Sequence, residues 1–367
     1  MTRGIAIAAM LAAAFAAAAA DKSSEAIIRL LNSRAAGSPK DYTQAAEIVA
    51  ADAERGRPLQ QFILAVVAMD ADLPEKLRIT PERRAEYLSR SRDKIRLLAE
   101  KKNNSLAWYL LSLEKNDMKY LKLAADGGNV QALNAWGTIM LTDAVRNVAV
   151  NTNDVADTVS KCLECFKKAA GEGDANGLYN LGMCYLGGYG CEQDRNLAFQ
   201  CFRTSAEKGH PEAINNMGGF YRDGIVVEKN MSTAADFFRR SADLGNAYGL
   251  LNYGLALQRG EGVEKDSAKA VECFRQAATR GNAEAMNAYG MCFHTGNGVA
   301  KDPAIAVTWF RASAARGFPP AMDNLASCYE LGLGVVRDSR QSTIWKVRGM
   351  AARGDRNAAA WLQQNAK

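Results

Sequence analysis

A glycine that recurs every 36 residues constrains this chain more than any other feature of its sequence. The members of the series are Gly173, Gly209, Gly245, Gly281 and Gly317. Gly354 follows after 37 residues, and Gly128 precedes the series by 45, so one unit carries an insertion. A fixed period of this length indicates an array of similar units, each of which buries its apolar face against its neighbours.

Two further recurring glycines lie in TGNGVAKD, residues 295–302. Glycine-rich segments before a helix bind phosphate in some proteins, because backbone N–H groups and the helix dipole favour an anion. This motif, however, recurs in other units, lacks the Lys-Ser/Thr of a P-loop, and follows no strand pattern. We therefore interpret Gly296 and Gly298 as part of a turn in which glycine permits positive φ. One unit has Val226 in place of the second glycine.

Each unit is predicted to be a pair of helices. A first helix would run from Ala283 to His294, and a second helix would begin after Asp302. Asp and Asn are preferred N-caps, and they recur at this position as Asp194, Asn230, Asp266, Asp302 and Asp338. In KDSAKAVECFRQAATRG, apolar residues at helical spacing form one face around Phe274. Abundant alanine and scarce proline also favour helices.

Phenylalanine and a packing glycine recur with the same period. The phenylalanines, in the second helices, are Phe166, Phe202, Phe238, Phe274 and Phe310. The glycines, in the first helices, are Gly137, Gly182, Gly218, Gly254 and Gly290, and Ala326 takes their place in the next unit. We expect the rings to be buried, with small residues beside them that let neighbouring helices approach closely.

The combined pattern in residues 282–317, NAEAMNAYGMCFHTGNGVAKDPAIAVTWFRASAARG, resembles the Sel1-like repeat family, a relative of the tetratricopeptide repeats. The strong matches cover residues 174–354, and residues 119–173 resemble a further unit with an insertion between its helices. The resemblance implies an all-α fold, a right-handed α/α superhelix (solenoid), with the array over residues 119–367. Residues 21–118 match poorly, and we interpret them as degenerate helix pairs that cap the array.

The first twenty residues, MTRGIAIAAMLAAAFAAAAA, have the pattern of a secretory signal peptide. The apolar stretch is short, which makes a membrane anchor the weaker alternative, and no later segment reaches about 18 uninterrupted apolar residues. Loss of Arg3 would lower the formal net charge from +6 to +5. So small an excess of positive charge does not indicate the concentrated basic surface that is typical of nucleic-acid-binding proteins. We expect an exported protein, periplasmic or secreted, without stable membrane insertion after cleavage.

Eight cysteines leave two alternatives open. Cys165 with Cys184, and Cys273 with Cys292, are each 19 residues apart, and each pair would join a second helix to the next first helix. An oxidising compartment would permit disulfides there. Equivalent positions elsewhere carry Phe, Trp or Ala, which is also typical of small buried thiols.

No pattern of a catalytic, metal or cofactor site stands out. The two histidines, His210 and His294, occupy an inter-repeat turn and the end of a first helix, where we expect surface positions. The G-x-S-x-G, H-E-x-x-H and P-loop patterns are absent. We therefore expect a non-enzymatic protein without a cofactor. The alternative is a secreted envelope enzyme or cell-wall-binding protein built on the same repeats.

Asparagine recurs two residues before the packing position, as Asn180, Asn216, Asn252 and Asn324, and Ala135 and Ala288 interrupt this column. The preceding position varies more and includes Tyr179, Asn215 and Asn287. The resemblance implies that first helices line a concave face, where tetratricopeptide arrays hold a peptide backbone with asparagine. An amide suits that role because it donates and accepts hydrogen bonds. We expect these residues to bind a protein or peptide segment; the alternative is that they satisfy local backbone groups.

Overall fold

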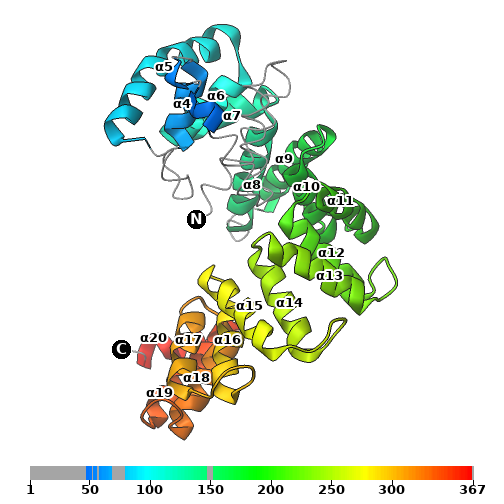
Figure 1. Ribbon diagram of the computed structural model, residues 1–367, viewed down its shortest axis with the longest axis vertical. Coiled ribbons are helices and arrows are strands. Elements are labelled where there is room, and N and C mark those ends of the chain that lie inside the picture. The colour runs from blue at the N-terminus through cyan, green and yellow to red at the C-terminus, as the bar shows by residue number, and fades with distance from the viewer. Residues whose placement is uncertain (1–46, 52, 56–57, 68–78, 147–151, 366–367) are drawn as a thin grey trace. The chain divides into compact units, whose positions relative to one another are not determined.

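The computed structural model describes residues 47–51, 53–55, 58–67, 79–146 and 152–365, and these ranges contain helices and turns but no strand. The predicted signal peptide, residues 1–20, lies outside the described part. None of the described helices is both long and apolar enough to cross a membrane. The residues group into two compact units, one ending at Ala213 and the other beginning at Ile214, whose helices are labelled in Figure 1.

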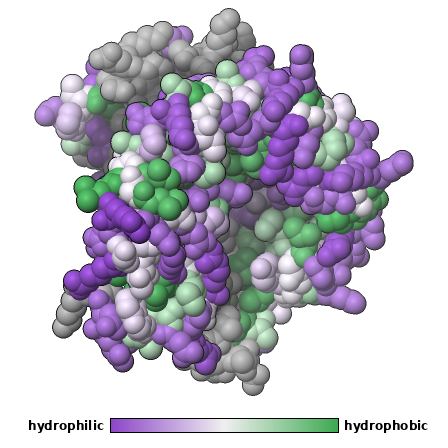
Figure 2. Space-filling model, turned by 90° about the horizontal axis from the view of Figure 1, so that it is seen from below, coloured by the Kyte–Doolittle hydropathy of each residue, from purple (hydrophilic) through white to green (hydrophobic). Residues whose placement is uncertain are grey.

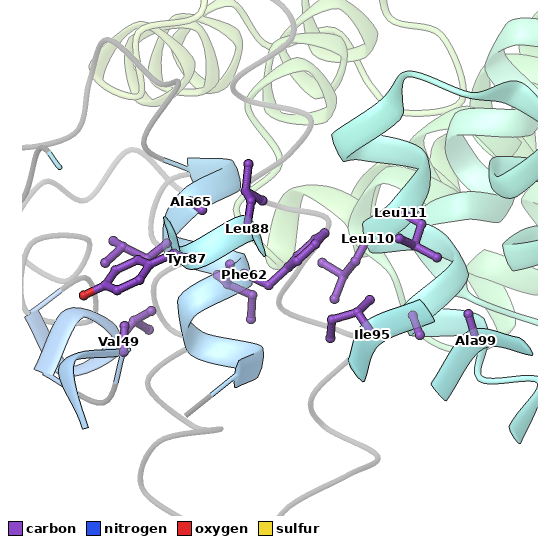
Figure 3. Packing of buried hydrophobic residues seen from close by; sticks show 13 residues of the cluster. Val49, Phe62, Ala65, Tyr87, Leu88, Ile95, Ala99, Leu110 and Leu111 are labelled. Carbon is purple, nitrogen blue, oxygen red and sulfur yellow. The ribbon is translucent and has the colours of Figure 1, made fainter. Parts of the chain in front are cut away.

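The described part of the first unit begins with helices of irregular length, α4 (Pro58–Val67), α5 (Pro81–Lys102), α6 (Ser105–Lys115) and α7 (Met118–Asp126), each packed against the next. Their core joins Phe62 of α4 to Tyr87 of α5 and Leu110 of α6 (Figure 3). Asn103 ends α5 with a φ of 46°, a left-handed conformation that asparagine tolerates better than most residues. The described part of residues 21–118 is thus helical, and its role as a cap stays a prediction.

The insertion predicted within residues 119–173 lengthens two helices. The helices α8 (Val130–Arg146) and α9 (Thr152–Gly171) have 17 and 20 residues, whereas α10 (Ala175–Gly187) and α11 (Arg195–Glu207) have 13 each. We expected the insertion between the helices, but the structure adds much of it to both. The stretch from residue 140 to 159 contains no glycine or proline that would end a helix. Residues 147–151 lie outside the described part.

The second unit repeats one helix pair with little variation. Its helices are α12 (Pro211–Asp223, which contains the division between the units), α13 (Met231–Asp243), α14 (Ala247–Arg259), α15 (Ser267–Thr279), α16 (Ala283–Thr295), α17 (Pro303–Ala314), α18 (Pro319–Leu331), α19 (Ser339–Ala352) and α20 (Arg356–Asn365). From α13 to α20 each helix packs against the next one along the chain. The all-α architecture of stacked helix pairs, predicted from the sequence, is confirmed.

The glycine pair in TGNGVAKD forms a turn, as predicted. Gly296 ends α16 with a φ of 79°, and the N–H groups of Gly296 and Asn297 both donate to the Cys292 carbonyl. Gly298 has a φ of 76° and packs against the preceding repeat, since a Cβ there would lie 2.2 Å from the Ser267 carbonyl oxygen. Two constraints, positive φ and a close backbone contact, therefore require glycine at residue 298.

The predicted N-caps of the second helices are confirmed. Each of the side chains Asp194, Asn230, Asp266, Asp302 and Asp338 accepts a backbone N–H of the helix that follows. The first helices are capped as well, by Asp174, Asn246 and Asn282. Phe318 stands at the equivalent position before α18 and makes no side-chain cap. This second series of caps was not predicted from the sequence.

Each recurring phenylalanine lies directly on a recurring glycine. A Cβ built on Gly137, Gly182, Gly218, Gly254 or Gly290 would stand 2.5 to 2.8 Å from a ring carbon of the phenylalanine in the same repeat. The ring of Phe274 is fully buried, so it has no room to move aside. In the last repeat, exposed Lys346 occupies the phenylalanine position and Ala326 the glycine position. The phenylalanine that a Cβ would meet in the other repeats is therefore absent where the alanine stands.

Candidate functional site

The two columns predicted to bind a ligand meet across neighbouring repeats. Asn252 Nδ2 on α14 donates a hydrogen bond of 2.8 Å to Asn215 Oδ1 on α12. Asn324 Nδ2 on α18 donates a bond of the same length to Asn287 Oδ1 on α16. All four side chains are half-buried. Because a primary amide offers two N–H donors and an oxygen with two lone pairs, one bond leaves part of each amide uncommitted.

Between α14 and α16, the helices that lie between these two pairs, apolar residues take the places of the two asparagines. Buried Leu251 stands where Asn215 and Asn287 stand in their repeats, and half-buried Ala288 stands where Asn252 and Asn324 stand. A buried amide opposite leucine would lack a partner, at a cost of about 1–3 kcal/mol. The asparagines therefore link neighbouring repeats, and their binding of a ligand stays a prediction.

The remaining predicted residues lie on α10 and α12. Tyr179 and Asn180 of α10 are half-buried, as is Asn216 of α12. The Tyr179 ring stacks on His210 with centroids 4.6 Å apart and an interplanar angle of 18°. Tyr179 is therefore already engaged inside the fold.

His210, expected at the surface, is enclosed. Its side chain is 10% exposed, Nδ1 accepts the Ala213 N–H at 3.3 Å, and Nε2 lies 3.1 Å from Asn176 Oδ1. Burial lowers the pKa of His210, and the Glu212 carboxylate offsets part of that effect. The neutral ring thus caps α12. Among the described residues, no group of three or more His, Cys, Asp or Glu could hold a metal ion.

All eight cysteines are free thiols in the structure, including the pairs Cys165 with Cys184 and Cys273 with Cys292. Burial raises the pKa of Cys184 to about 12 and that of Cys273 and Cys292 to about 11. Because the thiolate is the nucleophile, these thiols are poorly reactive at neutral pH. Under oxidising conditions both alternatives, disulfides in these two pairs and buried thiols, stay predictions.

A cleft in the second unit was not predicted from the sequence. It has a volume of about 360 Å³ and is lined by Tyr248, Gly281, Asn282, Ala283, Glu284, Arg316 and Phe318. These residues come from two neighbouring repeats, residues 247–282 and 283–318, so no single repeat contains the pattern. On the face shown in Figure 2, hydrophilic side chains predominate and hydrophobic ones gather in small separate patches.

The chain is similar to several proteins of known structure. A Sel1 repeat protein from Oxalobacter formigenes shares 29% identity over 61% of this chain and 89% of that protein, with a TM-score of 0.54. A protective antigen of uropathogenic Escherichia coli shares 23% identity over 94% of this chain and 82% of its own, with a TM-score of 0.41. The cysteine-rich protein B of Helicobacter pylori shares 27% identity over 35% of this chain and 94% of its own, with a TM-score of 0.29. No curated protein matches the chain.

The model of the Sel1 repeat matches six consecutive segments, residues 159–174, 175–210, 211–246, 247–282, 283–318 and 319–345. Their boundaries follow the 36-residue period, and the match begins within the predicted array rather than at residue 119. The phenylalanine contacts on Gly182, Gly218, Gly254 and Gly290, the N-caps of the second helices and the glycine turns lie inside these segments, whereas Gly137 lies before them. The chain therefore belongs to the Sel1 repeat family.

Proposed function

We propose that the chain is an exported, non-enzymatic scaffold or adaptor that binds a segment of another protein along its first helices. The observation that carries the proposal is the pair of amide links, Asn252 with Asn215 and Asn324 with Asn287. Each half-buried pair leaves amide donors and acceptors uncommitted next to solvent. An extended backbone needs both donors and acceptors at regular spacing, which such pairs can supply.

Export is supported by residues 1–20, whose charged start, apolar stretch and alanine-rich end are typical of a signal peptide. A non-enzymatic role is supported by the residues that carry reactive groups. His210 is a neutral helix cap, and the thiols Cys184 and Cys292 have raised pKa values. Each of these groups has a role in folding or packing that accounts for its position.

The test is a crosslinking pull-down from the envelope fraction of the source cells. One bait is the chain from residue 21 onward. The second bait carries Asn215→Leu with Asn252→Ala and Asn287→Leu with Asn324→Ala, which copies the native pair Leu251 and Ala288. Because that pair already packs between repeats, the variant should fold, and circular dichroism with urea unfolding checks it.

We expect a partner that the first bait retains and the folded variant loses. A partner retained equally by both baits would exclude the asparagine pairs as its binding site. If neither bait retains a partner after crosslinking, the scaffold proposal itself fails.

A further inference from the structure

The cleft of the second unit lies where the inter-repeat turns meet the starts of the first helices. Tyr248 belongs to the first turn of α14, Glu284 to the first turn of α16, and Arg316 and Phe318 to the turn before α18. These positions recur in every repeat, but their side chains differ. The chemistry of the cleft is therefore particular to this place in the array.

Arg316 supplies a cation that forms no ion pair with Glu284 or with any other described residue. It lies over the preceding turn with Nη2 3.6 Å from where a Cβ of Gly281 would stand. Its equivalent in the next repeat, Arg353, pairs with Asp323. Its equivalent in the preceding repeat, Arg280, lies over Gly245 in the same way. A guanidinium without an ion-pair partner can take a carboxylate, which arginine commonly binds through two parallel N–H groups.

Two aromatic rings accompany this cation. The side chain of Tyr248 is 60% exposed. Phe318 replaces the asparagine that caps the other first helices at residues 246 and 282, and it gives up the cap hydrogen bond. Pro319 follows at the first helical position, where the missing N–H costs nothing. A half-buried ring therefore stands where other repeats place a polar cap.

We propose that this cleft binds an extended protein segment that carries one carboxylate beside a large apolar side chain. The carboxylate pairs with Arg316, and the apolar side chain lies against Tyr248 and Phe318. Glu284, which also lines the cleft, repels a second acidic residue and so selects against strongly acidic segments. The inference rests on the proposed function, because it assumes a protein ligand, but it concerns another surface than the asparagine pairs.

The test uses the full chain and a fluorescein-labelled peptide, Gly-Ser-Asp-Phe-Ser-Gly, in an anisotropy titration up to about 1 mM protein. Comparison peptides replace Asp by Asn or Phe by Ala. Arg316→Gln removes the cation, and Arg280→Gln is the matched control one repeat earlier, where Glu212 and Asn282 replace the two rings. Loss of a charge-assisted bond predicts weakening by about tenfold or more for Arg316→Gln and for the Asn peptide.

The Kd of the control variant for the Asp-Phe peptide should lie within about twofold of that of the native chain, a difference in binding free energy smaller than RT. Two further observations belong to the expected result. The Asn and Asp peptides should bind Arg316→Gln equally, and the Phe-to-Ala peptide should bind the native chain more weakly.

Absence of binding to the Asp-Phe peptide would overturn the inference, as would equal losses in the Arg316 and Arg280 variants. The same variants in the pull-down separate this inference from the proposed function. A partner that Arg316→Gln retains in full would refute the cleft and leave the scaffold intact. If no bait captures a partner, the scaffold proposal fails, while the peptide titration still decides about the cleft.

Discussion

Replacement of Gly254 by alanine tests the idea that the recurring glycine exists to receive the phenylalanine ring. The new Cβ would stand 2.7 and 2.9 Å from two ring carbons of Phe274, and 3.2 Å from Cys273 Cβ. Overpacking of this kind costs about 1–3 kcal/mol. Alanine recovers about 1 kcal/mol through its better helix propensity. We therefore expect a net loss of up to about 2 kcal/mol in the free energy of unfolding.

The assay is urea unfolding followed by circular dichroism at the helix band, with the slope of the transition compared between variants. Gly219→Ala is the matched control, since Gly219 also lies inside a first helix but a Cβ there would meet nothing within 4 Å. That variant should be stabilised by up to about 1 kcal/mol, because only the propensity gain remains.

A double-mutant cycle sharpens the test. Phe274→Ala alone should cost about 3–5 kcal/mol, since the ring is fully buried. In the double variant the alanine methyl at residue 254 enters the space that the ring has left, so the two effects should not add. Additive effects, or a stability of Gly254→Ala above that of the native chain, would refute the reasoning.

Three further predictions follow from the same contacts. Val226→Gly should raise the urea midpoint, by about 1 kcal/mol in unfolding free energy, because Val226 has a φ of 67° and β-branched residues are strained there; a lower midpoint would contradict this. Because burial depresses the pKa of His210 below 6.5, the unfolded chain binds that proton first, so stability is full above pH 6.5 and declines as the pH falls below it. His210→Asn, which copies the native caps, should reduce that decline, and an unchanged pH profile would argue against it. Native Cys184, whose pKa is raised to about 12, should be alkylated at pH 8 slower by about two to three orders of magnitude than after unfolding; resistance after unfolding without reductant would instead reveal a disulfide.

The repeated parts of the fold could be predicted because each position is sampled several times in one sequence. The cap at Asp302, the ring of Phe274 and the turn at Gly298 each recur with a fixed offset, so a local physical rule could be checked against its copies. The insertion before α9 occurs once. Without copies, its length suggested a loop, although its lack of glycine and proline was compatible with longer helices.

The candidate site was harder to predict because its contacts cross repeats. His210 looked like a turn residue, but Tyr179 and Asn176 of the preceding repeat enclose it. Asn252 reaches Asn215, 37 residues earlier, and no periodic pattern within one helix indicates such a partner. The cleft around Arg316 draws on still more distant segments. A sequence identifies the columns of an array more readily than the pairings between neighbouring columns.

The departures from each column nevertheless separate structural positions from positions available for binding. Where a residue varies together with its partner, as Ala326 does with Lys346 and Ala288 does with Leu251, the partner explains the change. Tyr248 differs in this respect, because its side chain is 60% exposed. A substitution that the fold does not require is the kind that a ligand can select. Side-chain specificity in this array should therefore be sought at such positions, whereas the paired asparagines would hold the backbone of the bound segment.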